Sequence, residues 1–169
     1  GSGKPALAIL ALTKIVENGY QGALMAPTEV LAAQHFKTFQ QVFKGMPVKT
    51  AYLSGHTKAA ERKEILEQLK DGSIHILIGT HALIEENVVF SALGLVITDE
   101  QHRFGVKQRQ ALESKGKSPH VLIMTATPIP RTMALSVYGD LDVSFIKGMP
   151  PGRHPVKTYV VGSHMLQRI

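Results

Sequence analysis

Apolar residues recur along this chain in two patterns, one typical of amphipathic helices and one typical of buried strands. Short, nearly continuous apolar runs bounded by Gly, Pro or polar residues predict strands at 22–26, 48–53, 74–78, 93–98, 121–125 and 156–161. The segments between them predict helices at 5–17, 28–43, 58–70, 105–114 and 130–138. Pro5 falls in a first helical turn, where its missing N–H is tolerated, and Thr28 is placed to cap the second helix.

Strands that alternate with helices predict an α/β fold, with a mostly parallel sheet and helices on both faces. We expect one domain over residues 1–149. The segment 149–155 contains three Pro and one Gly in seven residues, which predicts a boundary. Residues 150–169 are therefore interpreted as a linker and the start of a second domain.

The composition of the 169 residues is that of a soluble globular protein, with 44% hydrophobic and 19% charged residues. The absence of Cys excludes disulfides, thiolate zinc sites and cysteine nucleophiles. No apolar run is long enough to span a membrane, and the first residues do not resemble a signal peptide, so we expect no membrane partner. A net charge of +6 suits a polyanionic partner without specifying one.

The eight histidines have no spacing typical of a metal site. Five of them are interpreted as ordinary surface or capping residues: His35, His56, His75, His120 and His154.

In open parallel α/β sheets, ligands bind beyond the carboxyl ends of the strands. Polar segments follow four of the predicted strands, and a fifth opens the chain ahead of the first helix. We expect all of them to converge on one edge of the sheet: residues 1–4, 26–29, 79–81, 99–102 and 125–128.

The opening residues Gly1-Ser2-Gly3-Lys4 have the form of the second half of a phosphate-binding loop. Glycines let backbone N–H groups face an anion, the start of a helix favours negative charge, and a lysine can reach the β- and γ-phosphates. Taken alone, the tetrapeptide also fits a flexible terminus with a solvated lysine.

Asp99 and Glu100 directly follow an apolar strand. Phosphoryl transfer needs Mg²⁺ near the phosphates and an oriented water, and two adjacent carboxylates can serve these roles. Two solvated carboxylates capping a turn are the alternative. The nearby Arg103, Lys107 and Arg109 fit either a solvated face or a contact with DNA or a neighbouring domain.

Read together and in order, these motifs resemble those of superfamily 2 helicases. GSGK (1–4), APTEVLAAQH (26–35), GTHALI (79–84), DEQH (99–102) and TATPIP (125–130) correspond to motifs I, Ia, Ib, II and III. The longer segments LMAPTEVLAAQH (24–35), DEQHRFGVKQR (99–109) and MTATPIPRTMAL (124–135) resemble the RecG-type ATP-dependent DNA helicases over essentially the whole chain. The resemblance implies a RecA-like P-loop domain, the first of two helicase domains.

The resemblance also implies roles for single residues. The phosphates of ATP would be bound by Gly1, Ser2, Gly3 and Lys4. Asp99 would hold Mg²⁺ through water, and Glu100 would activate the attacking water. Nucleotide binding and its coupling to DNA would involve Gln101, His102, Thr125, Ala126 and Thr127. The DNA backbone would lie along Pro27, Thr28, Glu29, Gly79, Thr80 and His81, with salt-dependent and largely sequence-neutral binding.

The chain departs from the family pattern at three points. Pro5 stands where the family has Thr, so a hydroxyl for Mg²⁺ and a backbone N–H for phosphate are both missing. The strand that precedes the phosphate loop is absent, so we expect an N-terminally truncated domain with a gap inside its sheet. The second RecA-like domain and the wedge domain are also outside the sequence. Residues 162–165 resemble a vector scar, but 159–169 fit the family's continuation.

We therefore predict that the parent protein is an ATP-hydrolysing helicase or translocase that remodels branched DNA, such as forks and Holliday junctions, in recombination and repair. The resemblance implies a cytoplasmic, nucleoid-associated bacterial enzyme, and these residues alone should be inactive. Two alternatives remain: the first motor domain of another superfamily 2 translocase of the transcription-repair coupling type, and a silent nucleic-acid-binding module, which Pro5 favours.

Overall fold

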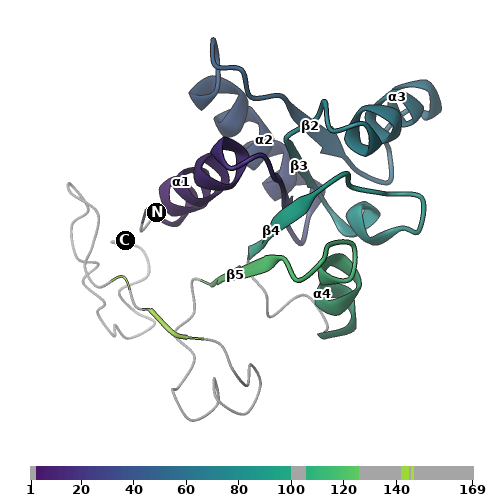
Figure 1. Cartoon of the computed structure of the whole chain (residues 1–169). Helices are drawn as coiled ribbons and strands as arrows, with labels where there is room; N and C mark the ends of the chain where they lie inside the picture. Colours follow the sequence, from purple (N-terminus) through teal and green to yellow (C-terminus); the bar gives the residue numbers. More distant parts are fainter. Residues whose placement is uncertain (1–2, 100–105, 126–141, 145, 147–169) are drawn as a thin grey trace, which may run out of the picture.

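The computed structural model describes residues 3–99, 106–125, 142–144 and 146. Its centre is a five-stranded sheet flanked by helices (Figure 1). The strands are β1 (Gln21–Met25), β2 (Thr50–Leu53), β3 (Ile76–Gly79), β4 (Leu93–Asp99) and β5 (His120–Met124). Each of them begins and ends within two residues of a predicted strand.

Four α-helices and one short 3₁₀ helix connect the strands. They are α1 (Lys4–Glu17), α2 (Glu29–Val42), α3 (Ala59–Lys70), η1 (His81–Ile84) and α4 (Val106–Glu113). The four α-helices match the predicted ones, whereas η1 was not predicted because four residues are too few to show helical periodicity. The helix predicted at 130–138 and the strand predicted at 156–161 lie outside the described residues.

The sheet has the strand order β2-β3-β1-β4-β5, and every neighbouring pair is parallel. The predicted mostly parallel sheet is therefore confirmed. The five described strands each hydrogen-bond directly to the next, so no gap lies between them, and the gap expected from the missing first strand stays a prediction. A further strand could join these five only at the outer edge of β2 or of β5. The side chains of β5 are mostly half-buried, whereas those of the central β1 are all buried.

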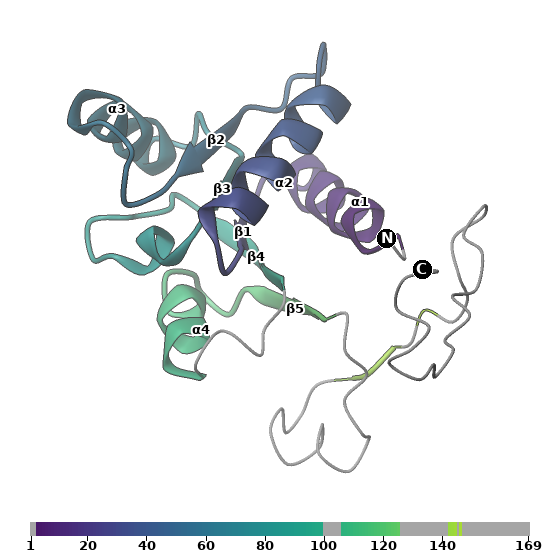
Figure 2. The same cartoon turned by 180° about the vertical axis from the view of Figure 1, so that it is seen from behind.

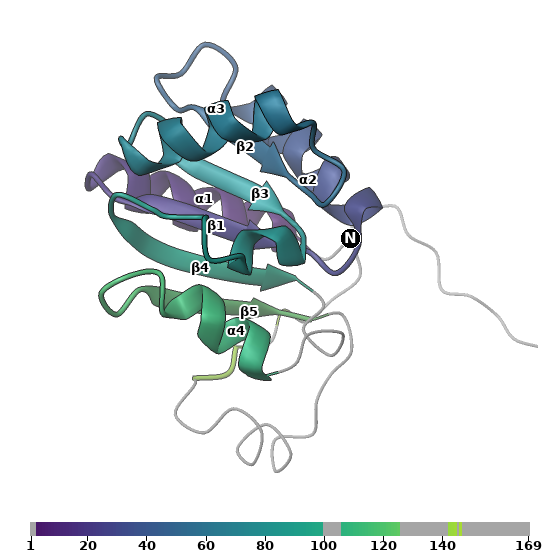
Figure 3. The same cartoon turned by 90° about the vertical axis from the view of Figure 1, so that its right-hand side faces the viewer.

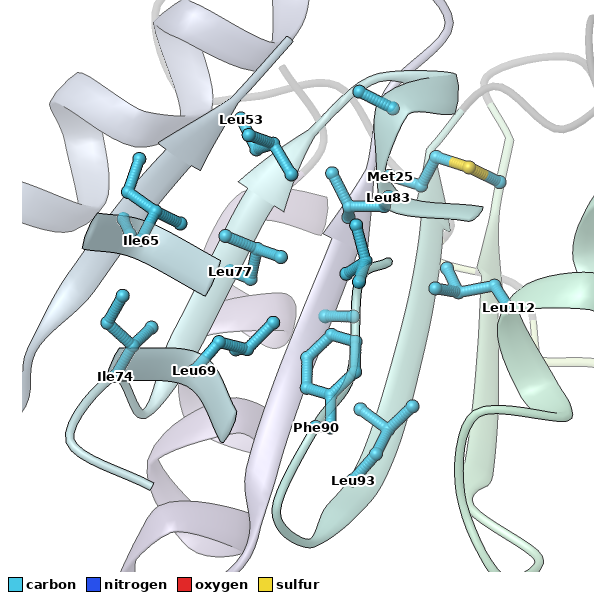
Figure 4. Close-up of a cluster of buried hydrophobic side chains, with 14 of the residues drawn as sticks. Met25, Leu53, Ile65, Leu69, Ile74, Leu77, Leu83, Phe90, Leu93 and Leu112 are labelled. Atoms are coloured by element: carbon cyan, nitrogen blue, oxygen red, sulfur yellow. The ribbon is translucent and has the colours of Figure 1, made fainter. Parts of the chain in front are cut away.

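Helices cover both faces of the sheet, as predicted (Figures 1 and 2). On one face, Ala8 and Leu12 of α1 and Phe39 of α2 pack over β1, β3 and β4; we call this cluster the α1–α2 core. On the other face, side chains from α3, η1 and α4 form the α3–α4 core (Figure 4). Its labelled members include Leu69, Leu83 and Leu112. Burial of apolar side chains on both faces explains why the strands read as continuous apolar runs.

Among the described residues, no helix is both long and apolar enough to cross a membrane.

The ends of the parallel strands define one edge of the sheet, toward which all the arrows point in Figure 3. We call it the carboxyl edge; its last strand residues are Met25, Leu53, Gly79, Asp99 and Met124. Helix α1 runs in the opposite direction to the strands, because its Leu12 packs beside Gly22 at the beginning of β1. The first turn of α1 therefore also lies at the carboxyl edge.

Candidate functional site at the carboxyl edge of the sheet

The fold brings the described parts of all five predicted polar segments to the carboxyl edge. Lys4 begins α1, Thr28 follows β1, Thr80 follows β3, Asp99 ends β4 and Thr125 follows β5. Residues as far apart in the sequence as Lys4 and Thr125 thus share one edge because parallel strands point the same way.

Asp99 is buried at the end of β4 and pairs with His35 of α2. The Nε2 atom of His35 lies 2.7 Å from the Oδ2 atom of Asp99, and both side chains are about nine-tenths buried. The interpretation of Asp99 as a solvated, turn-capping carboxylate was therefore wrong. The interpretation of His35 as a surface or capping residue was also wrong, because it faces the sheet together with Ala32 and Phe39.

The first turn of α1 has the backbone features of an anion-binding helix start. Gly3 precedes the helix with a φ of +80°, a left-handed conformation that glycine adopts without strain. Its carbonyl accepts a hydrogen bond from the Leu7 amide. Pro5 is the second residue of α1 and has no N–H, so the turn offers one backbone donor fewer than it would with another residue there.

The segment after β1 is organised by Thr28 and Glu29. The Thr28 hydroxyl caps α2 by accepting a hydrogen bond from the Leu31 amide. The Oε1 atom of Glu29 lies 2.8 Å from Nδ1 of His56. This hydrogen bond lowers the pKa of Glu29, with smaller contributions from Ser54 and His81. The same bond raises the pKa of His56.

The segment after β3 is mostly buried. A side chain at Gly79 would collide with the carbonyl oxygen of Leu53, so glycine is required by the close approach of two strands. Thr80 is also buried, and its hydroxyl has no hydrogen-bond partner among the described residues. Of the three residues predicted to lie along DNA here, only His81 has an exposed side chain.

The sequence reasoning missed the turn after β2. Ser54 accepts a hydrogen bond from the His56 amide, and the Thr57 hydroxyl accepts one from the Ser54 amide, so the turn is internally fixed. It presents the exposed His56 next to Glu29. The signal was available, because Ser54-Gly55 follows a predicted strand and must reach the same edge as the other motifs.

The basic residues of α4 differ in their surroundings. Lys107 is exposed, as a solvated face predicts. Arg109 instead is largely buried. Its Nε atom lies 3.0 Å from Oε1 of Glu113, and its Nη1 atom is buried with no hydrogen-bond partner in the part of the chain that the structure describes. The solvated interpretation was therefore wrong for Arg109.

Several predicted site residues lie outside the described residues, and for them the predictions stay as they are: Gly1, Ser2, Glu100, Gln101, His102, Arg103, Ala126 and Thr127.

The described residues fit a magnesium ion that is held mainly by a nucleotide. No group of three metal-binding side chains occurs among them. Mg²⁺ commonly binds one or two carboxylates together with substrate phosphates rather than a full protein cage. Asp99 matches that requirement, because only its Oδ2 atom is engaged by His35 within the described structure.

Residues 1–135 match the family model of the DEAD/DEAH box helicases. This match covers most of the chain and includes every motif noted above. The chain belongs to the DEAD/DEAH box helicase family. The predicted resemblance to RecG-type helicases is likewise confirmed by similar proteins.

The ATP-dependent DNA helicase RecG of Bacillus subtilis is 56% identical over 169 residues, which is all of this chain and 25% of that protein. RecG of Synechocystis is 54% identical over 161 residues, covering 95% of this chain and 19% of that protein. The chain thus spans a quarter or less of the length of these two relatives.

Solved structures of helicases have the same fold. A structure of RecG bound to a three-way DNA junction superposes with a TM-score of 0.84 and 47% identity, over 99% of this chain and 22% of that one. The DUF1998 helicase MrfA, solved with DNA and AMPPNP, has a TM-score of 0.65 at 20% identity, which supports the fold alone. The RecA-like helicase fold predicted from the motifs is therefore confirmed.

Proposed function

We propose that this chain is the ATP-binding motor half of an ATP-dependent DNA helicase that acts on branched DNA, such as forks and Holliday junctions, in recombination and repair. The observation that carries the proposal is the convergence at the carboxyl edge. The buried Asp99, the first turn of α1 and the turn carrying Thr28 and Glu29 meet there in the fold of a family that uses ATP to move on nucleic acid.

In this proposal, ATP binds with its phosphates at the first turn of α1. Gly1, Ser2 and Gly3 provide backbone N–H groups, and Lys4 provides a positive charge to the β- and γ-phosphates. Asp99 holds Mg²⁺ through a water, Glu100 activates the attacking water, and Gln101 and His102 contact the nucleotide. When bound, Mg²⁺ neutralises charge that develops on the phosphates.

The DNA backbone is proposed to follow the turns after β1 and β3. Contacts come from Pro27, Thr28, Glu29, Gly79, Thr80 and His81, and because Gly79 and Thr80 are buried, theirs can only be backbone contacts or contacts made through neighbours. Thr125, Ala126 and Thr127 couple the nucleotide state to DNA. The similarity to a RecG solved on a three-way junction supports branched DNA as the substrate.

We further propose a domain boundary near residue 149. Residues 1–149 form the first RecA-like domain, and 150–169 lead into the second. The second RecA-like domain and the wedge domain would be partners within the same polypeptide, and the enzyme would act in the bacterial cytoplasm at the nucleoid. Without these partners, residues 1–169 are expected to bind nucleotide weakly and not to unwind DNA.

A silent nucleic-acid-binding module is the second candidate, and Pro5 is the observation that favours it. Proline removes one phosphate-binding N–H from the first turn of α1. A module of this kind would bind DNA without turning over ATP.

The deciding experiment is the DNA-stimulated ATPase activity of the full-length protein and of its Glu100→Gln variant. We expect forked DNA to stimulate hydrolysis in the wild type and the variant to lose at least about a hundredfold, the usual size of a general-base contribution. A matched control is Glu113→Gln, which removes a carboxylate on α4 that pairs with Arg109. A full-length protein that binds forked DNA without hydrolysing ATP would favour the silent module.

A further inference from the structure

The buried pair of His35 and Asp99 joins two segments that the helicase motifs treat separately. Asp99 ends β4 in the segment assigned to Mg²⁺, whereas His35 belongs to α2, which begins in the segment assigned to DNA. We propose that His35 is a positioning residue of the ATPase site: it holds Oδ2 of Asp99 and leaves Oδ1 as the oxygen available to the hydrated metal. This inference rests on the proposed function.

The geometry supports a directed contact rather than incidental packing. The 2.7 Å distance between Nε2 and Oδ2 is short for a nitrogen–oxygen hydrogen bond, as charge-assisted bonds are. Both side chains are about nine-tenths buried, so little water competes for the carboxylate. Among the described residues, His35 is the hydrogen-bond partner of the Asp99 side chain, and this bond restricts the rotation of the carboxylate.

The helix that carries His35 is a firm support. Its first turn is capped by Thr28, and Ala32 and Phe39, three and four residues away from His35, are fully buried against the sheet. Spacings of three and four place these residues on one helix face, so the imidazole projects from the side of α2 that is locked into the α1–α2 core. A positioning group works best when its own side chain is fixed by packing in this way.

Partners that orient a metal-binding side chain commonly change metal affinity 10- to 100-fold when they are removed, while the metal-free fold changes less. If His35 had a purely structural role, its removal would have the reverse effect. The protein would be less stable, but the molecules that stay folded would need the same Mg²⁺ concentration. The two roles can therefore be separated by titrating Mg²⁺ rather than by measuring activity.

The test uses the full-length protein and a fluorescent ATP analogue, whose binding is followed while Mg²⁺ is raised from zero. For His35→Leu we expect the Mg²⁺ concentration at half-saturation to rise by about tenfold or more. His35→Gln keeps an N–H donor at a similar reach and should stay within about threefold of the wild type. His75→Leu is the matched control, because His75 bonds the Lys49 amide at the opposite end of the sheet.

Thermal unfolding without metal or nucleotide reports on the fold of each variant. If His35→Leu does not fold, His35→Asn replaces it, since its amide is too short to reach Oδ2 but keeps a polar group in place. An unchanged Mg²⁺ half-saturation in either folded variant overturns the inference, and so does a shift in His35→Gln as large as that of the variant without the donor.

If Glu100→Gln abolishes ATP hydrolysis while the Mg²⁺ requirement is unchanged in the His35 variants, only this inference fails. If Glu100→Gln retains full hydrolysis, the proposed function fails.

Discussion

His56 and Glu29 form an exposed ion pair that joins the turn after β2 to the start of α2, with 2.8 Å between Nδ1 and Oε1. Their hydrogen bond lowers the pKa of Glu29 and raises that of His56. Both groups are charged between the ordinary glutamate value of 4.5 and the ordinary histidine value of 6.5, so the attraction is complete in that interval. It is lost as the pH rises through the raised pKa of His56 or falls through the lowered pKa of Glu29.

We predict that the His56 ring titrates above 6.5 in the wild type and that its midpoint falls back toward 6.5 in Glu29→Gln. An NMR titration of the histidine ring protons measures both midpoints. Glu17→Gln is the control, because Glu17 pairs with Lys14 at the far end of α1. An equal midpoint for His56 in the wild type and in Glu29→Gln would show that the pair does not form in solution.

Pro5 is predicted to weaken nucleotide binding. In Pro5→Thr the first turn of α1 regains a backbone N–H and gains a hydroxyl, and a hydrogen bond to a charged group is worth about 1.5–3 kcal/mol. We therefore expect Mg²⁺-nucleotide affinity to rise by about tenfold or more, measured by calorimetry. Pro5→Ala restores only the N–H and should show a smaller gain.

The silent-module hypothesis makes a different prediction for the same variants. An ATPase rate of the full-length protein that stays at zero in Pro5→Thr, despite tighter nucleotide binding, would favour it over the helicase.

The close approach of β2 and β3 at Gly79 predicts a strong effect of a single methyl group. A Cβ atom there would lie 1.9 Å from the carbonyl oxygen of Leu53 and 2.3 Å from Cδ1 of Leu83. Since the backbone oxygen cannot rotate away, Gly79→Ala should reduce the free energy of unfolding by about 2 kcal/mol or more, measured by urea denaturation. The control is Gly55→Ala, whose Cβ would have nothing within 4 Å and should cost less than about 0.5 kcal/mol. Equal stabilities of the two variants would contradict the packing described here.

The sequence predicted most of this fold because its strands are buried on both faces. A short apolar run such as 93–98 is typical of a strand that is buried on both faces. The Gly, Pro and capping residues around such runs mark where the strands and helices end. The site was predicted only in outline. The rule that ligands bind at the carboxyl ends of strands brought Lys4, Thr28 and Asp99 to one edge, but it carries no information on which side chains pair there.

The pairs of the site were missed for a physical reason. His35 and Asp99 are 64 residues apart, and their contact depends on how closely α2, which packs mainly against β2 and β3, approaches the end of β4. Nothing in the local pattern distinguishes a histidine on a buried helix face that meets a carboxylate from one that meets only apolar atoms. The burial of Thr80 was missed as well. Thr80 directly precedes η1, and this helix is too short to leave a periodic signal in the sequence.

Gln21 provides a test of how the amino-terminal side of the sheet is held together. Its Nε2 atom donates to the carbonyl oxygens of Leu69 and Ile74, and its Oε1 atom accepts from the Ala92 amide, so one buried side chain ties α3 and two loops to β1. Gln21→Leu removes a hydrogen-bond partner from the Ile74 carbonyl and the Ala92 amide, whereas the Leu69 carbonyl keeps its bond from the Gly72 amide. We expect a loss on the order of 3 kcal/mol in the free energy of unfolding. Gln40→Leu, at an exposed position of α2, is the control and should change stability by less than about 0.5 kcal/mol. Urea denaturation measures the stability of both variants. Similar midpoints for Gln21→Leu and Gln40→Leu would mean that water replaces the lost hydrogen bonds and that the Gln21 side chain is not needed for stability.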